Sequence, residues 1–472
     1  MLFNSLEFFI FFVLVICLYS VVQQRYKTGL LMLTSWYFYG FWDLKFVFLI
    51  VFSTGVNYFF GVCIQKGSSK KIKYAWLVIS VITNLSLLGF FKYFNFFIDS
   101  LSCVLSAMGC QDPLPYVKIL LPIGISFYTF QAMSYTIDVY REKIQACKDF
   151  FDFGAFVSFF PLLLAGPIER ASNLLPQLKG HHLPKSQVLI SGFFLFSWGL
   201  FKKIVIADNL SPISDLVFGS DPRAPLDTGL ALLGAYAYTF QIYCDFSGYT
   251  DMARGTAKFF GIELTLNFNS PYLAESIRDF WRRWHISLSS WFRDYLYIPL
   301  GGNRGGAFDT HRNVLITMTL CGLWHGASWM YVLWGVYHGI LMILERTAIY
   351  SRWIEERQSK WVKRLWTFQL IALGWVIFRS PDMDVLNHWG GMLVSMNAHP
   401  DYYHLWGYLL FFLCPLYVMR RFRTLFTGSA LHDGMGFLGG KQAFSAVMLT
   451  LFYWGVMVYG ADQARAFIYF QF

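Results

Sequence analysis

Apolar runs recur along the whole chain and are separated by short polar stretches. Runs of this kind predict membrane helices, because a helix needs ~20 mostly apolar residues to cross a bilayer. We expect helices at 6–22, 29–41, 44–64, 74–91, 117–137, 151–166, 187–208, 228–244, 313–324, 328–345, 365–380, 405–419 and 443–460. The more polar region 262–312 indicates interfacial helices and loops.

Several of these runs are shorter than a full crossing, and glycines or prolines interrupt them. Exposed backbone at membrane depth is tolerated only where protein or water covers it. The short runs therefore predict broken or re-entrant helices around a cavity. We expect an all-α polytopic membrane protein with a single membrane domain over residues 1–472.

The composition supports lipid as the solvent of this chain. It is 56% hydrophobic and 14% charged, whereas a soluble protein carries roughly a quarter charged residues. The run 6–22 lacks a basic region before it and an Ala-x-Ala site after it, so we interpret it as an uncleaved span. Arg25 and Lys27 follow this run, which predicts an N-terminus on the outer face.

The net charge of +10 comes from basic residues that we expect in short loops, such as Lys202-Lys203 and Arg420-Arg421. This is the positive-inside pattern, with some attraction to anionic membrane lipid, and it argues against nucleic-acid binding. With Arg420 in the cytoplasm, the last span leads the C-terminal residues to the outer face.

The eight cysteines form no Cys-x-x-Cys pair, so neither a zinc site nor a disulfide framework is indicated.

Two histidines lie in one of the most apolar parts of the chain: His325, within Leu-Trp-His-Gly, and His338, within Val-Tyr-His-Gly. Ionisable groups at membrane depth are costly, so both are functional candidates; the alternative is a buried histidine with satisfied hydrogen bonds. On one continuous helix they would lie ~20 Å apart and point about 140° apart. They meet only if the chain breaks between them, which Gly326 and Gly335 allow. Otherwise one performs the chemistry and the other lines the approach to it.

A dense cluster of arginine and aromatic residues precedes these histidines. Arginine has a planar fork suited to phosphate, and tryptophan prefers the headgroup level of a membrane. The cluster predicts either an amphipathic interfacial helix or a cytoplasmic site for an anionic, phosphorylated donor. Its candidate residues are Arg282, Arg283, His285, Arg293, Asp294, Asn303 and Arg304. Asp294 can pair with Arg293 or Arg282.

Two carboxylates, Asp245 and Asp251, follow the apolar run 228–244 directly. They can pair with Arg254 or with the later arginines and hold a cavity wall together. Their spacing alone indicates no acid–base role, so we interpret both as structural polar residues.

Four of the last six residues, 467–472, are aromatic. One interpretation is an interfacial aromatic anchor. The other is a tethered peptide that enters a pocket and offers the Tyr469 hydroxyl as a nucleophile.

Several motifs together resemble the membrane-bound O-acyltransferase family, specifically its bacterial polysaccharide O-acetyltransferase branch. The resemblance runs nearly the whole chain, and the combination of motifs is specific where any one alone is weak. The motifs are Leu121-Pro-Ile-Gly-Ile-Ser-Phe-Tyr128, Ile137-Asp-Val-Tyr140, Ala165-Gly-Pro167, Asp245-Phe-Ser-Gly-Tyr249, Phe280-Trp-Arg-Arg-Trp-His285, Arg293-Asp-Tyr-Leu-Tyr297, Gly301-Gly-Asn-Arg304 and Trp324-His-Gly326.

The resemblance implies a helical bundle around a central funnel, in the inner membrane of a bacterium. It implies that His325 is the catalytic histidine and that His338 is the second functional one; His285 also matches a family position. The segment 467–472 resembles a fused acyl-shuttle motif. In that scheme Tyr469 accepts the acyl group and passes it to a serine of a separate extracytoplasmic transferase, for O-acetylation of a polysaccharide such as alginate or peptidoglycan.

The mechanism expected from these residues needs no cofactor and no metal. Acetyl-CoA or another cytoplasmic thioester docks at the arginines, and His325 acts as general base, roughly a 10²–10⁴-fold effect. Asn303 and Trp324 are the candidate oxyanion donors. Two other functions stay open: a transporter or flippase of an activated acyl group or lipid-linked sugar, and a lipid or protein acyltransferase of the same family.

Overall fold

The computed structural model describes residues 1–109, 117, 119–180, 184–219, 225, 227–350, 358–397, 399–421, 440–460 and 467–468. Every regular element within these residues is helical, which confirms the all-α expectation. They form two compact units. The prediction of a single membrane domain stays a prediction.

The first unit comprises residues 1–183, 259–265 and 326–328. Its helices are α1 (Leu6–Val21), η1 (Gln24–Tyr26), α2 (Lys27–Gly40), α3 (Leu44–Lys66), α4 (Lys70–Leu88), η2 (Gly89–Tyr93), α5 (Phe94–Ala107), α6 (Ile125–Tyr140), α7 (Phe150–Ser158), α8 (Phe160–Leu163) and α9 (Ala171–Gly180). The break between α7 and α8 interrupts the expected run 151–166, as its short length predicted.

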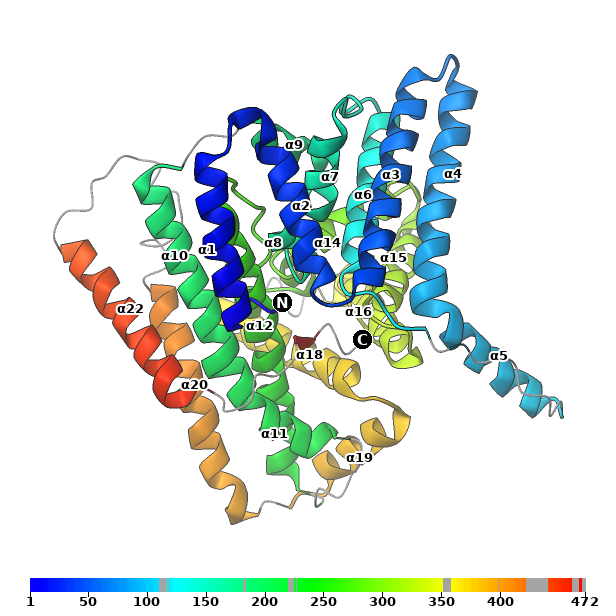
Figure 1. Ribbon diagram of the computed structural model, residues 1–472. Helices are drawn as coiled ribbons and strands as arrows, with labels where there is room; N and C mark the ends of the chain where they lie inside the picture. The colour runs from blue at the N-terminus through cyan, green and yellow to red at the C-terminus, as the bar shows by residue number, and fades with distance from the viewer. Residues whose placement is uncertain are drawn as a thin grey trace. The chain divides into compact units, whose positions relative to one another are not determined.

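Helices α3 and α4 of this unit lie side by side as a long hairpin (Figure 1). Their interface holds a reciprocal amide pair. Asn57 donates to Oδ1 of Asn84 at 3.1 Å, and Asn84 donates to Oδ1 of Asn57 at 2.8 Å. Both side chains are buried. Since each amide satisfies the other, two polar groups are accommodated between largely apolar helices.

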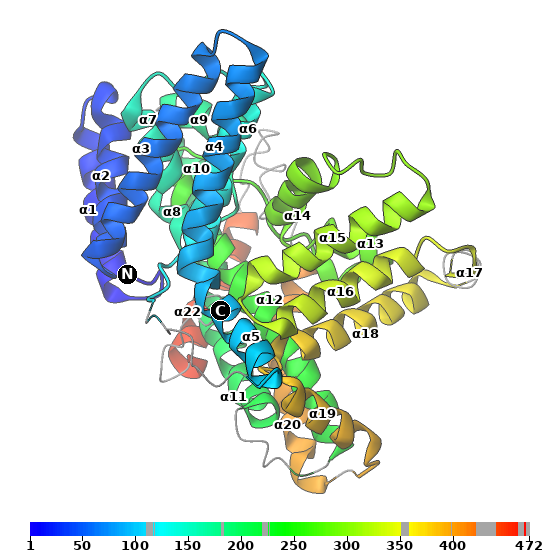
Figure 2. The same ribbon diagram turned by 90° about the vertical axis from the view of Figure 1, so that its right-hand side faces the viewer.

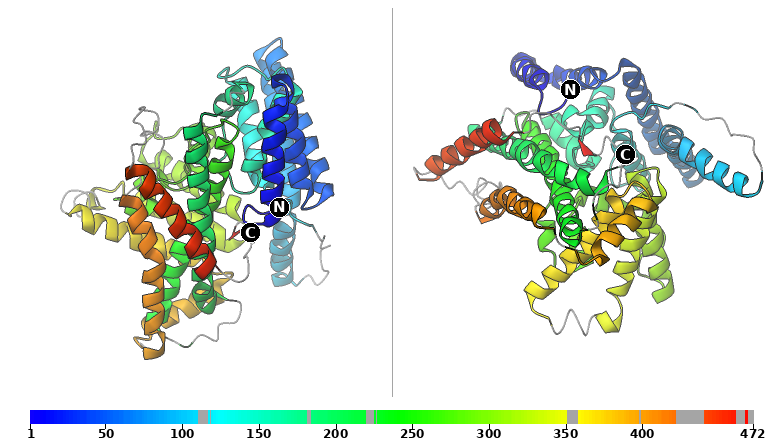
Figure 3. Two further views of the ribbon diagram at one scale, coloured as in Figure 1. Left: turned by 60° about the vertical axis from the view of Figure 1, so that its left-hand side comes forward. Right: turned by 90° about the horizontal axis from the view of Figure 1, so that it is seen from below.

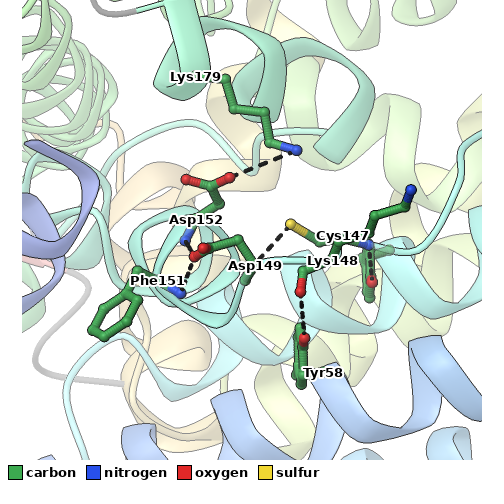
Figure 4. Close-up of polar contacts among 8 residues, drawn as sticks. Tyr58, Cys147, Lys148, Asp149, Phe151, Asp152 and Lys179 are labelled. Carbon is green, nitrogen blue, oxygen red and sulfur yellow. Dashed lines mark hydrogen bonds and ion pairs between the residues drawn. The ribbon is translucent and has the colours of Figure 1, made fainter. Parts of the chain in front are cut away.

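A short polar loop leads into α7, and Figure 4 shows how it is fixed. The Asp149 carboxylate caps the helix by accepting two backbone N–H groups of its first turn, at 2.7 and 3.1 Å. The Tyr58 hydroxyl donates to the Lys148 carbonyl at 2.7 Å, and Lys179 pairs with Asp152 at 3.6 Å. The two Asp149 bonds satisfy backbone N–H groups that a helix start otherwise leaves without partners.

The second unit comprises residues 184–258, 266–325 and 329–472. Its helices are α10 (Ser186–Phe201), η3 (Lys202–Ala207), α11 (Asp208–Phe218), α12 (Thr228–Lys258), η4 (Pro271–Leu273), α13 (Ile277–Trp281), α14 (Ile286–Phe292), η5 (Arg293–Tyr297), α15 (Ala307–His325), α16 (Trp329–Leu344), α17 (Ala348–Tyr350), α18 (Lys360–Arg379), α19 (Met383–Val394), η7 (Pro400–Tyr402), α20 (Tyr403–Arg421) and α22 (Gly440–Tyr459). The elements between α12 and α15 are short helices and loops, as expected from 262–312. Their location at the membrane interface stays a prediction.

Backbone-to-backbone packing joins α10 and α12 at the centre of this unit. A Cβ atom at Gly199 would lie 2.5 Å from the Gly248 carbonyl oxygen, and one at Gly248 would lie 2.8 Å from that of Gly199. Small residues at such crossings let helices approach closely in a membrane. Helix α22 packs against α10, and α20 contacts α12 (Figure 3).

Three helical stretches among the described residues are long and apolar enough to cross a membrane: Leu44–Lys66, Lys70–Ala107 and Ser186–Phe218. They support the predicted membrane nature of the chain. The orientation of the termini stays a prediction.

Two sequence interpretations in the second unit are wrong. Helix α12 continues to Lys258, so Asp245 and Asp251 lie within it rather than after it. Lys202 and Lys203 are not loop residues that report topology. They are buried in the π-helical segment η3 between α10 and α11, because carboxylates of neighbouring helices neutralise them there.

Candidate functional site

The two candidate histidines converge because the chain breaks between them, which is the arrangement that the sequence left open. Helix α15 ends at His325 and α16 begins at Trp329. The Trp334 indole lies between the two rings: its centroid is 5.1 Å from that of His325 and 4.8 Å from that of His338. The two histidines are therefore not held ~20 Å apart, as they would be on one continuous helix.

Close packing of α15 on α16 makes this convergence possible. A Cβ atom at Gly322 would lie 2.1 Å from the Tyr331 carbonyl oxygen, so only glycine fits there. Gly335 meets the Met318 carbonyl in the same way, at 2.4 Å. Figure 2 shows α15, α16 and α18 running side by side.

His338 is fully buried, and within the described part of the chain neither of its ring nitrogens has a hydrogen-bond partner. Trp281 of α13 contacts its ring at 5.2 Å between centroids. On α18, a Cβ atom at Gly374 would lie 2.8 Å from His338 Nε2, so the glycine leaves room for that nitrogen. Buried polar atoms are nearly always hydrogen-bonded, so an imidazole of this kind is suited to a ligand or to water.

Trp334 is a residue that sequence reasoning did not select. Its indole is fully buried, and its N–H also lacks a partner among the described residues. The available signal was its spacing, because residues four apart share one helix face and Trp334 precedes His338 by four. The indole and the imidazole thus present polar atoms within one aromatic enclosure.

His285 stands in the loop between α13 and α14, with a left-handed backbone at φ 41°. Its Nδ1 lies 3.2 Å from the Asn267 Oδ1. An amide oxygen only accepts, so Nδ1 carries the hydrogen. Burial lowers the pKa of His285 to about 3, and the ring is therefore neutral at pH 7.

A row of aromatic rings connects His285 with His325. Phe246 of α12 contacts His285 at 4.7 Å between centroids. The Trp324 ring centroid lies 6.0 Å from that of His285 and 5.1 Å from that of His325, so Trp324 links the two imidazoles. Trp324, a candidate oxyanion donor, is buried and packs against both imidazoles.

Glu345, directly after α16, anchors the arginine-containing segment and was also missed. Its carboxylate accepts the backbone N–H groups of Ile277 and Arg278, the second at 3.1 Å, at the start of α13. The carboxylate is buried. A negative charge at a helix N-terminus is favourable, so Glu345 fixes α13 to α16.

The candidate arginines lie outside the enclosure. Arg282, Arg293 and Arg304 are exposed, and Arg283 is half-buried and pairs with Asp279 at 2.8 Å. They suit a surface site for a charged molecule rather than chemistry at the histidines.

Asp294 pairs locally with Arg293 at 2.8 Å, one of the two predicted arrangements. Asn303 is exposed. A donor in a water-excluded site stabilises an oxyanion far better than an exposed one, so the position of Asn303 does not favour that role.

The carboxylates of α12 have structural partners, as predicted, although the principal ones are lysines. Asp251 pairs with Lys202 at 2.6 Å and with Arg254 at 3.8 Å. Asp245 pairs with Lys203 at 2.8 Å. Lys202, Asp251 and Arg254 also line a mostly apolar groove of about 390 Å³ beside α10, α12 and α20.

Only two residues of the C-terminal motif, Phe467 and Ile468, belong to the described part of the chain. Both are buried. Phe467 contacts the rings of Tyr249 and Phe246 at 4.5 and 5.7 Å between centroids. Tyr469 lies outside the described residues.

Among the residues that the structure describes, no group of three or more His, Cys, Asp or Glu side chains could hold a metal ion.

Comparison with known proteins shows the family to which this chain belongs. The model of the membrane-bound O-acyltransferase family matches residues 115–380. A probable alginate O-acetylase of Azotobacter vinelandii is 45% identical over 389 residues, 82% of this chain and 76% of that protein. A peptidoglycan O-acetyltransferase of Helicobacter pylori is 39% identical over 78% of this chain and 74% of its own. A teichoic acid D-alanyltransferase of Streptococcus thermophilus is 28% identical over 54% of this chain and 68% of its own. The chain is therefore an O-acyltransferase and belongs to the membrane-bound O-acyltransferase family.

Proposed function

We propose that this enzyme moves an acetyl group from a cytoplasmic thioester to Tyr469. In this scheme Tyr469 passes the group to a serine of a separate extracytoplasmic transferase, which acetylates a polysaccharide. The relatives named for acetyl transfer are 45% and 39% identical, against 28% for the one named for D-alanyl transfer, which favours acetyl over other acyl groups. Their names suggest alginate or peptidoglycan as the final acceptor.

One observation carries the proposal: the C-terminal segment belongs to the same aromatic network as the histidines. Phe467 contacts Phe246, Phe246 contacts His285, and Trp324 connects His285 with His325. A surface anchor would not need to be buried among these rings. The contacts therefore favour the tethered peptide over the interfacial anchor.

The chemistry proposed for this place is acyl transfer to a phenol. A tyrosine hydroxyl has a pKa of ~10 in water and stays protonated at neutral pH. His325 removes the phenol proton while the Tyr469 oxygen attacks the thioester carbonyl. The C–S bond breaks, a C–O ester bond forms, and the thiolate leaves with a proton. Attack of the partner's serine on this ester then regenerates Tyr469.

Two further roles complete the scheme. An oxyanion forms on the thioester carbonyl, and donors in a water-excluded site stabilise it. Trp334 is our candidate donor, since its buried indole adjoins both histidines. His338 supports the enclosure from α16. The exposed Arg282, Arg293 and Arg304 bind the phosphates of a donor such as acetyl-CoA.

The test is labelling of the purified protein with isotopically labelled acetyl-CoA, followed by mass spectrometry of its C-terminal peptide. We expect label on Tyr469 in the native chain. His325→Ala should reduce the label at least a hundredfold, since a general base supplies roughly 10²–10⁴-fold. Tyr469→Phe should abolish it.

The matched control is His311→Ala, which removes a histidine at the opposite end of α15 from His325. It should label like the native chain. Absence of label in the native protein, or full label in His325→Ala, would contradict the proposal. Transport of an acyl donor without any adduct would instead favour a transporter.

A further inference from the structure

Three buried charges meet where η3, α11 and α12 converge. Lys203 Nζ lies 2.7 Å from the Asp208 carboxylate and 2.8 Å from the Asp245 carboxylate. All three side chains are buried. One ammonium thus faces two carboxylates. A buried carboxylate is tolerated only when further donors reach it.

The C-terminal segment supplies such a donor. The Ile468 backbone N–H donates to Asp245 Oδ2 at 2.7 Å, across 223 positions of sequence. Lys203 contacts the other oxygen, Oδ1. The carboxylate therefore bridges the lysine and the tail. By binding Oδ1, Lys203 fixes the orientation of the carboxylate and with it the position of Oδ2, which the tail uses.

Side chains next to Asp245 on α12 hold the residue before Ile468. Tyr249 follows Asp245 by four positions, on the same helix face, and its ring lies 4.5 Å from that of Phe467. Phe246 contacts Phe467 from the adjacent position. One short stretch of α12 thus offers a charged acceptor for the tail's backbone and two rings for its aromatic side chain.

We propose that Asp245, oriented by Lys203, is the positioning residue that seats the C-terminal segment for acyl transfer. The inference rests on the proposed function of Tyr469, which follows Ile468 directly in the chain. The Asp245 carboxylate accepts only a backbone N–H of the tail and so does not depend on the side chain at position 468. The rings of Tyr249 and Phe246 favour an aromatic side chain at position 467. Asp245 contacts Lys203 and the tail, so its effect on acyl transfer is through the tail.

The experiment separates docking of the tail from acyl transfer. Amide hydrogen exchange of residues 460–472, followed by mass spectrometry, reports docking in the full-length protein. Ile468→Pro removes the donated N–H without altering any residue of the helices. Ile468→Ala removes the same side chain but keeps the N–H and is the matched control.

We expect the tail of Ile468→Pro to exchange about tenfold to a hundredfold faster than that of Ile468→Ala, from the loss of a hydrogen bond to a charged group. Asp245→Ala should release the tail to the same extent. Asp245→Asn, which retains an acceptor oxygen, should restore much of the protection. The Asp251 carboxylate binds Lys202 instead, so Asp251→Ala should leave hydrogen exchange of the tail unchanged.

Acetyl labelling of Tyr469 is measured on the same variants. If the tail of Ile468→Pro and that of Asp245→Ala exchange like the Ile468→Ala tail, the docking role is overturned even where Tyr469 becomes labelled. If the tail depends on Asp245 but Tyr469 is never labelled, the docking role holds and the acyl shuttle fails. Loss of both protection and label in Ile468→Pro, with both kept in Ile468→Ala, supports the two together.

Discussion

At the scale of single residues, the site depends on buried polar atoms for which the described protein supplies no hydrogen bond. His338 has two such ring nitrogens and Trp334 has its indole N–H. Leaving such atoms unsatisfied costs roughly 1–3 kcal/mol each. A fold retains such a cost where a ligand or water meets the atoms in the working state. The sequence pointed to both histidines but not to Trp334, because an indole among many aromatic residues carries no distinguishing pattern.

Gly374→Ala tests the space kept around His338. The added Cβ would lie 2.8 Å from Nε2, and the imidazole is enclosed by aromatic rings, so it has to shift or turn. We expect acetyl labelling to fall at least tenfold, since an ångström of misplacement is felt strongly in catalysis. Gly390→Ala on α19, which has nothing within 4 Å, is the control. Equal labelling in the two variants would show that His338 needs no such space.

At the scale of helices, apolar runs predicted most of the elements with boundaries a few residues away. The run 44–64 became α3 and the run 405–419 became α20. Helices α5 and α19 were not expected, because they are short or amphipathic. The extent of α12 was also missed, since its charged residues resemble a loop until the neutralising lysines are known. Hydropathy alone does not distinguish a charge in water from a paired charge within a bundle.

The amide pair between α3 and α4 yields a test of how this hairpin is held. Asn57→Leu and Asn84→Leu should each lower the unfolding free energy by about 1–2 kcal/mol, because each leaves the other amide without its partner. The double variant should lose less than the sum of the two. Thermal unfolding in detergent measures all three proteins. Additive losses would show that the two amides do not act as a pair.

At the scale of the whole molecule, the proposed reaction is vectorial: the donor approaches the exposed arginines and the acceptor is the C-terminal segment. The sequence placed these on opposite faces through the positive-inside rule. Lys202-Lys203 no longer counts toward that rule, since both lysines are buried in ion pairs. The expected orientation therefore rests on the remaining basic stretches, such as Arg420-Arg421.

Charge reversal tests the donor side. Arg282 is exposed, so Arg282→Glu should raise the KM for acetyl-CoA about threefold to fivefold and change kcat little, the magnitude expected of one exposed ionic contact. Added salt should reduce the difference from the native enzyme. Arg346→Glu, at another exposed arginine, makes the same change in net charge and is the control. An equal rise in both variants would indicate a general field effect rather than a binding site.

The sequence by itself determined the solvent of this protein, its helical class, its family motifs and the two histidines, because hydropathy and short motifs are local properties. Only the tertiary structure decided which groups meet. The break after His325 places two histidines at one indole, and Lys203, Asp245 and Ile468 converge from three distant segments. Such partnerships arise from close packing between helices, and the spacing of residues along the chain does not encode them.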